Sequence, residues 1–156
     1  MQSNAESYAA FEKELGGALI RAGRLDARGL DRALRLRSSG SDSLIDLLPR
    51  LGLISERDLA DAIARHLGLP LVASRDYPEL PILEDKISAR FLRDAHVLPL
   101  SVETDGVSVA MADPLNRFAV DAIHLVTGLR VKPRVAVPAE LEAAIDRLHG
   151  RDQAAA

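Results

Sequence analysis

The stretch that decides the fold runs from Leu44 to Val72 and reads LIDLLPRLGLISERDLADAIARHLGLPLV. Gly52 ends its first apolar run, and Ser55 is suited to cap the next helix, because a serine oxygen can accept a backbone N–H of the first helical turn. Three apolar residues then recur at the spacing of one helix face: Leu59, Ile63 and Leu67. Gly68 ends that helix. The stretch predicts a helix, a turn and a second helix, followed by an extended segment.

A second copy of this pattern lies upstream, shifted by 29 residues. Leucines, turn glycines and capping residues fall into register in pairs: Leu15 with Leu44, Leu19 with Leu48, Gly23 with Gly52, Leu25 with Ile54, Asp26 with Ser55, Leu30 with Leu59, Ala33 with Ala62, and Leu34 with Ile63. One pair of short helices cannot bury its apolar face alone. We therefore predict two tandem helix–turn–helix units that share a core. The alternative is two unrelated amphipathic hairpins.

Beyond Val72 the pattern becomes mixed. Two prolines in residues 73–83 indicate a linker. The remaining elements are predicted from alternating apolar runs, turn residues and helical spacing: a helix at 85–95, strands at 96–103 and 107–112 around a turn centred on Asp105-Gly106, a helix at 116–127 capped by Asp113, a strand at 130–137, and a helix at 138–149. Pro133 in the last strand indicates an edge strand or a bulge.

The sequence therefore predicts an α+β protein in two parts. Residues 1–72 form a helical tandem-repeat subdomain. After the linker at 73–83, residues 84–150 form a small α+β subdomain with a sheet of three or four strands and flanking helices. Residues 151–156 are expected to be a tail outside the folded part.

The composition limits the classes of protein to which the chain can belong. Hydrophobic residues make up 47% of its 156 residues, enough for a core, and the net charge of -3 argues against a nucleic-acid partner. The sequence contains no Cys, which excludes disulfides and Cys-based zinc sites. No apolar run approaches the roughly 20 residues of a membrane span, and the N-terminus lacks the features of a signal peptide. We therefore expect a cytoplasmic protein.

No pattern of catalytic or metal-binding residues stands out. None of the three lysines follows a glycine, so a phosphate-binding P-loop is absent, and the motifs of metalloproteases, hydrolases and dinucleotide-binding folds are absent too. The histidines lie far apart, without the spacing of metal ligands: His66, His96, His124 and His149. We therefore expect no enzyme activity, no metal and no cofactor.

Three stretches resemble one known family. Residues 51–72, the segment His96-Val-Leu-Pro-Leu, and the pair Ala-Asp-Pro at 112–114 and Thr-Gly at 127–128 are similar to the N-terminal domain of type II secretion and type IV pilus assembly ATPases. The resemblance covers roughly residues 10–150. It implies a non-catalytic adaptor that docks a hexameric ATPase onto the cytoplasmic part of an inner-membrane platform protein, with the ATPase core downstream. Contact with the membrane would then be only indirect.

Some members of this family bind cyclic di-GMP through two tandem copies of a motif with Arg-Leu-Gly, leucines at helical spacing and a final Gln. The resemblance implies that the ligand residues of this chain would be Leu15, Gly16, Leu19, Arg37, Leu44, Leu48 and His66. The apolar positions fit the motif, but the polar ones differ. Glu14 and Ser43 stand in place of the two arginines, Arg37 and His66 in place of the glutamines, and Ile45 in place of the second glycine.

The polar differences weaken the case for nucleotide binding. A glutamate at position 14 would face a dianionic ligand with a like charge. Two lost charge-assisted phosphate contacts, at about 1.5–3 kcal/mol each, would lower the affinity by about 100-fold or more. We therefore interpret the repeat as a structural scaffold for protein binding, with a cyclic di-GMP-sensing module as the alternative.

Overall fold

The computed structural model describes residues 4–40 and 42–150, so the expected tail at 151–156 lies outside the described residues. The chain divides into two compact units, Met1–Gly68 and Leu69–Ala156. We expected the helical part to extend to Val72, whereas the structure assigns residues 69–72 to the second unit.

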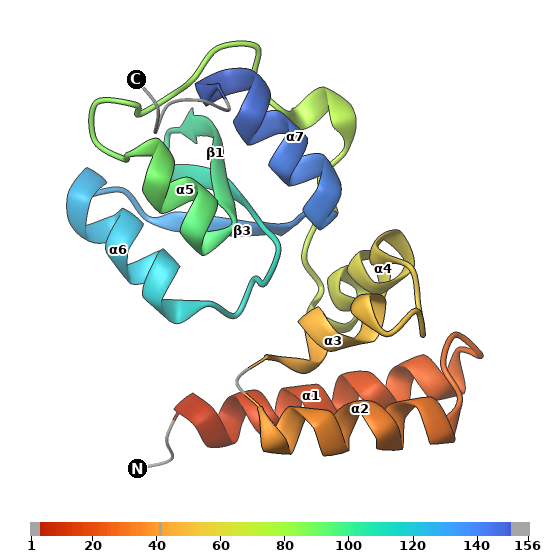
Figure 1. The fold of residues 1–156 in the computed structure, drawn as a ribbon. Helices are drawn as coiled ribbons and strands as arrows, with labels where there is room; N and C mark the ends of the chain where they lie inside the picture. The colour runs from red at the N-terminus through yellow and green to blue at the C-terminus, as the bar shows by residue number, and fades with distance from the viewer. Residues whose placement is uncertain (1–3, 41, 151–156) are drawn as a thin grey trace. The chain divides into compact units, whose positions relative to one another are not determined.

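The first unit is helical throughout its described part. It contains α1 (Asn4–Arg21), α2 (Ala27–Ser39), α3 (Leu44–Arg50) and α4 (Glu56–Leu67) (Figure 1). The packing is crosswise between the two hairpins, because α1 packs against α4 and α2 packs against α3. The leucines of the predicted repeat provide the core, and four of them are fully buried: Leu15, Leu19, Leu44 and Leu48.

The backbone hydrogen bonds confirm the repeat. At the first turn the N–H of Arg24 donates to the carbonyl of Leu19 at 3.0 Å, and 29 residues later the N–H of Leu53 donates to that of Leu48 at 3.1 Å. The turn glycines have φ of 73° and 74°, a left-handed conformation that favours glycine. The caps also match, since Asp26 accepts the N–H of Gly29 and Ser55 accepts that of Asp58. The two hairpins are therefore equivalent structures.

The copies differ where Gly16 in the first corresponds to Ile45 in the second. A Cβ atom added to Gly16 would lie 2.8 Å from a methyl group of Leu30, so the absence of a side chain lets Leu30 lie against α1. Ile45 is itself buried. Glycine at position 16 thus serves helix packing in the first copy alone.

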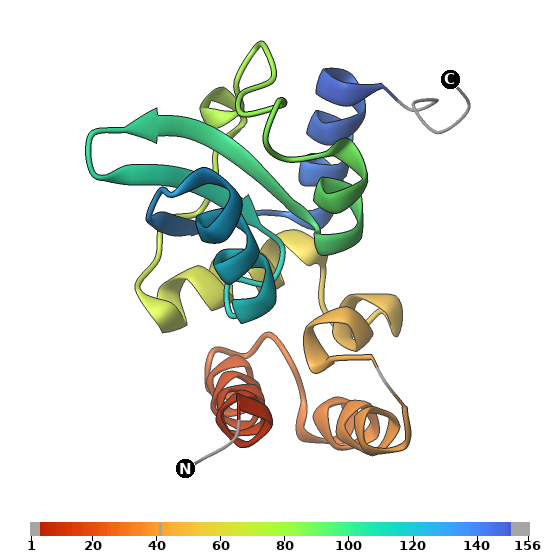
Figure 2. The same ribbon diagram turned by 90° about the vertical axis from the view of Figure 1, so that its left-hand side faces the viewer.

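The second unit contains a short 3-10 helix, η1 (Ser74–Asp76), and a mixed sheet with helices. The order is α5 (Ala89–Ala95), β1 (Val97–Glu103), β2 (Gly106–Met111), α6 (Arg117–Thr127), β3 (Val131–Val135) and α7 (Pro138–His149). In the described residues the strand order is β1-β2-β3, with β1 antiparallel and β3 parallel to β2. Figure 2 shows the β1–β2 hairpin extending away from α5 and α7. The predicted α+β class is confirmed.

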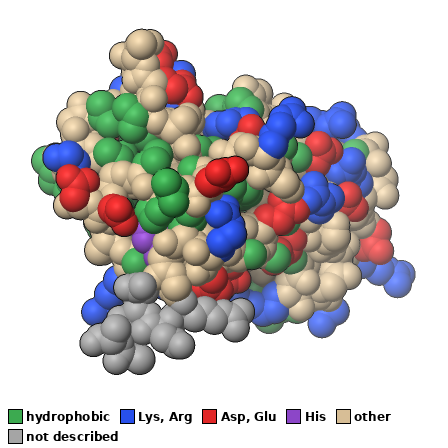
Figure 3. Space-filling model, turned by 90° about the horizontal axis from the view of Figure 1, so that it is seen from above, with side chains coloured by type: hydrophobic (Ala, Val, Ile, Leu, Met, Phe, Trp, Pro, Cys, Tyr) green, Lys and Arg blue, Asp and Glu red, His purple; other side chains and the backbone are tan. Residues whose placement is uncertain are grey.

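The segment that leads into this unit is part of it. Leu71 forms a parallel bridge with Val135, and the N–H of Val72 donates to the carbonyl of Val135 at 2.8 Å. The expected linker, residues 73–83, also contacts the unit, since Asp76 pairs with Arg134 at 3.0 Å and Arg147 donates to the carbonyl of Pro78. Figure 3 shows one face of the molecule, on which hydrophobic side chains gather beside charged ones.

Three local predictions were inexact. Asn116, not Asp113, caps α6 by accepting the N–H of Ala119, whereas Asp113 accepts the N–H of Leu115 in the preceding turn. The hairpin turn consists of Thr104 and Asp105, and Gly106 already pairs with Glu103 as the first residue of β2. Helix α5 begins at Ala89 after the cap residue Ser88, because residues 84–87 are used in a turn.

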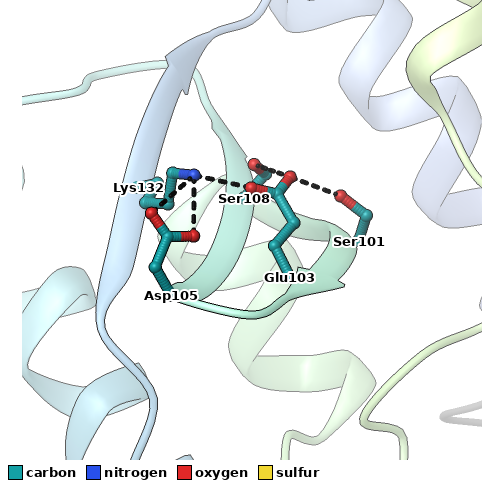
Figure 4. Close-up of polar contacts among 5 residues, drawn as sticks. All are labelled: Ser101, Glu103, Asp105, Ser108 and Lys132. Atoms are coloured by element: carbon teal, nitrogen blue, oxygen red, sulfur yellow. Dashed lines mark hydrogen bonds and ion pairs between the residues drawn. The ribbon is translucent and has the colours of Figure 1, made fainter.

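A polar network joins the end of the hairpin to β3 (Figure 4). Lys132 of β3 donates to Glu103 at 2.6 Å and to Asp105 at 3.1 Å. The second carboxylate oxygen of Glu103 accepts the hydroxyl groups of Ser101 at 3.0 Å and Ser108 at 2.8 Å. The hydrogen bond from Lys132, followed by those from the two serines, lowers the pKa of Glu103 from 4.5 to about 2.

Gly106 provides a test of this hairpin. Its φ is 150°, and a Cβ atom there would lie 2.3 Å from the carbonyl oxygen of Arg130. We expect Gly106→Ala to destabilise the second unit by roughly 2–4 kcal/mol, because both strain and a backbone clash oppose it. Urea unfolding followed by hydrogen exchange in each unit measures this. Gly17→Ala, inside α1, should instead be neutral or stabilising by up to about 1 kcal/mol; equal effects of the two variants would contradict the assignment.

The network provides a second test. A depressed folded-state pKa means that the contribution of Glu103 to stability is present above pH 4.5 and is lost as the pH falls through about 2. We expect Lys132→Met to move the pKa of Glu103 upward toward 4.5, because the largest stabilising hydrogen bond is removed. A carboxyl NMR titration measures the shift, with Lys86→Met as the control. An unchanged midpoint in the Lys132 variant would show that the two serines alone hold the carboxylate ionised.

Candidate functional site

The seven residues predicted as ligand contacts all lie in the first unit. The side chains of Leu15, Leu19, Leu44 and Leu48 are 0% exposed, so they form the core between the helices. Gly16 lies beneath Leu30. The two polar members lie at the edge of this core, where the side chain of Arg37 is 34% exposed and that of His66 is 24% exposed.

Arg37 binds a carboxylate that the sequence analysis missed. Its Nε donates to both oxygens of Glu12 at 3.2 Å, and the side chain of Glu12 is only 5% exposed. The backbone N–H of Leu44 donates to the same carboxylate at 2.8 Å. A buried charge needs such partners, because burial without them is costly. Glu12 therefore connects α1 to α2 and to the start of α3.

His66 lies against α1. Its Nε2 is 3.6 Å from Oε2 of Glu14, and its ring centroid is 5.9 Å from that of Phe11. The ring of Phe11 in turn meets Tyr8 edge-on at 5.8 Å. The carboxylate of Glu14 is mostly exposed, with 69% of the side chain accessible. This edge of the unit thus combines an aromatic pair, an imidazole and an acid.

The two polar groupings, Arg37 with Glu12 and Leu44, and His66 with Glu14, are related by the repeat. The start of the first copy, at Glu14, meets the end of the second copy, at His66. The start of the second copy, at Leu44, meets the end of the first copy, at Arg37, through Glu12. The motif positions that the family resemblance assigns to a ligand therefore come together in pairs across the two hairpins.

These groupings are suited to binding rather than to catalysis. Neither holds a nucleophile beside a base, which acyl or phosphoryl transfer would need. In the grouping around Arg37, the Glu12 carboxylate already engages both the guanidinium group and the N–H of Leu44. Across residues 4–40 and 42–150, no cluster of three or more His, Asp or Glu side chains is arranged to hold a metal ion.

A further charged cluster lies at the first turn. Arg24 donates to the carbonyl of Asp58 at 2.8 Å and to the carboxylate of Asp61 at 3.2 Å, and Arg65 donates to the same carboxylate. A shallow pocket lies beside it, lined by Gly23, Arg24, Leu25, Asp26 and Leu53. Because Arg24 is engaged by α4, this cluster holds the two hairpins together.

Comparison with known proteins agrees with the fold. Residues 67–155 match the MshEN domain. The chain is 36% identical over 148 residues to the type II secretion system protein E of Xanthomonas campestris pv. campestris, an alignment that covers 92% of this chain and 26% of that protein. The chain thus spans about a quarter of the length of this relative. Within the described residues, no helix has the length and apolar character needed to cross a bilayer.

Two solved structures are similar along most of the chain. The N-terminal domain of XpsE has a TM-score of 0.76 and 34% sequence identity, covering 96% of this chain and 99% of that one. The structure of MshE with cdg (cyclic di-GMP) has a TM-score of 0.68 and 25% identity, covering 86% of this chain and 98% of that one. The family match at 67–155 covers the α+β unit, whereas the seven predicted ligand residues lie outside it.

These matches confirm the resemblance inferred from the sequence and relate the chain to the ATPases of secretion machinery. The chain therefore belongs to the MshEN domain family.

Proposed function

We propose that this chain is a non-catalytic adaptor domain that docks a type II secretion ATPase onto the cytoplasmic part of an inner-membrane platform protein. The observation that carries the proposal is the similarity to the XpsE N-terminal domain across nearly the whole chain. The domain would act in the cytoplasm at the inner face of the membrane, which it would reach only through its partner.

The side chains support a protein-binding scaffold rather than a ligand site. The predicted ligand leucines are buried as core, and the polar residues beside them pair with one another. The P-loop that would bind ATP is missing from the sequence.

The second partner in this proposal is the protein's own ATPase region, in a hexamer, since the type II relative is about four times as long as the aligned segment. The net charge of -3 supports a protein partner over nucleic acid.

A cyclic di-GMP-sensing module is the second candidate. The structure of MshE with cdg favours it, as does the pairing of motif positions across the two hairpins. Two features oppose it. Glu14 places a carboxylate where a phosphate contact is needed, and Glu12 engages the guanidinium group of Arg37. The interpretation of the repeat as a scaffold for protein binding therefore remains the first proposal.

A titration tests the docking role. We expect the full chain to bind the purified cytoplasmic domain of the platform protein with a Kd of about 1–20 µM, a range typical of transient assembly contacts. Isothermal titration calorimetry measures the affinity. The matched control is the cytoplasmic domain of an unrelated inner-membrane protein of similar net charge. Absence of heat at tens of micromolar would rule out the adaptor role.

A nucleotide titration tests the second candidate. We expect the natural chain to show no thermal shift with excess cyclic di-GMP. The double variant Glu14→Arg with Ser43→Arg restores the two motif cations and should bind at least about 100-fold more tightly, since each charge-assisted contact contributes about 1.5–3 kcal/mol. Glu142→Arg on α7 serves as the control for added charge. Low-micromolar binding by the natural chain would instead make ligand sensing the better account of the repeat.

A further inference from the structure

Helix α6 carries apolar residues on two sides. Its inward side is buried, with Ala119 and Ile123 both 0% exposed. Its outward side is also apolar, with Phe118 74% exposed and Leu125 83% exposed. Outside the face that packs on the core, a surface helix normally carries polar residues. The outward face of α6 therefore has the composition of a contact surface.

The spacing of Phe118 and Leu125 gives the outward face of α6 a notch. Phe118 and Leu125 are seven residues apart, which is about 10 Å along the helix axis. Ala122 lies between them on the same face and is half-buried. Two large side chains with a small one between them form a notch that can receive a single large side chain of another helix. Val126, 50% exposed, extends the apolar surface on one flank.

A single exposed apolar residue would not indicate a contact surface. Leu80 is 75% exposed in the segment between η1 and α5, beside the half-buried Pro81. Isolated residues of this kind are normal on protein surfaces. The face of α6 differs because the exposed Phe118 and Leu125 lie seven residues apart with the half-buried Ala122 between them. Apolar residues at i, i+4 and i+7 are the anchor pattern by which an amphipathic helix meets a partner.

The other flank is charged. Arg117 and Asp121 are exposed on α6, and Arg130 is exposed just beyond its end. Among the described residues, no ion pair involves any of these three side chains. Two cations and one anion give this flank a positive balance, in contrast to the chain's net charge of -3. Complementarity then requires a partner with acidic residues beside its apolar stripe.

We propose that the outward face of α6 is the surface that binds the platform protein of the proposed function. The partner would contribute an amphipathic helix, with one large apolar residue in the notch between Phe118 and Leu125 and an acidic residue facing Arg117. This inference rests on the proposed docking role and adds the place and the chemistry of the contact. A contact made through one helix face is small, and small interfaces are typical of transient encounters.

Calorimetry with the full chain and the partner's cytoplasmic domain tests the inference. The variant is Phe118→Glu with Leu125→Glu, and the control is Leu80→Glu, which introduces one negative charge at a similarly exposed leucine outside α6. We expect roughly 100-fold weaker binding for the α6 variant, because central apolar anchors dominate such contacts, and a change under about threefold for the control. Both variants should keep the thermal midpoint of the natural chain, since the replaced side chains are exposed.

A second variant keeps the inference testable if the double variant is unstable. Arg117→Glu should weaken binding about tenfold at low salt, and the difference from the natural chain should shrink as salt is raised. If the natural chain binds and both α6 variants bind equally well, the surface is wrong while the docking role stands. If the natural chain does not bind at all, the docking role and this surface are both overturned.

Discussion

Short helices cannot bury an apolar face by themselves, and the first unit is built around this constraint. Each of its two hairpins exposes leucines that its own second helix does not cover. The solution is crosswise packing, in which α1 contacts α4 and α2 contacts α3, so that Leu15, Leu19, Leu44 and Leu48 are fully buried. The same packing brings the start of each copy to the end of the other, as the contacts of Glu14 with His66 and of Glu12 with Arg37 and Leu44 show.

Crosswise packing also explains the two polar groupings. Since the copies interlock, the beginning of one lies against the end of the other, which places Glu14 beside His66 and brings Arg37 to the start of α3. In this chain an internal acid takes part in each, and at Arg37 the buried Glu12 also contributes to the fold. The polar residues at both places thus serve contacts within the unit.

Local signals in the sequence predicted the repeat well. Apolar spacing, turn glycines and cap residues depend on neighbours a few positions away, and the structure confirms each of them in register. Long-range pairings were harder to predict. Glu12 precedes Leu15 and Leu19 by three and seven residues and so lies on the buried face of α1, but its partners at Arg37 and Leu44 depend on tertiary packing. Asp113 and Asn116 are both capable caps, and only the geometry of the turn decides between them.

The second unit shows where fold and function impose different requirements on one helix. A crossover helix between parallel strands must be apolar on the side that packs on the sheet, and Ala119 and Ile123 meet that need. Nothing in the fold requires apolar residues on the exposed part of the helix, because polar side chains there would leave the core unchanged. Exposed phenylalanine and leucine also increase the risk of aggregation. Their presence at regular spacing on α6 is therefore better explained by a contact with another molecule than by the stability of this one.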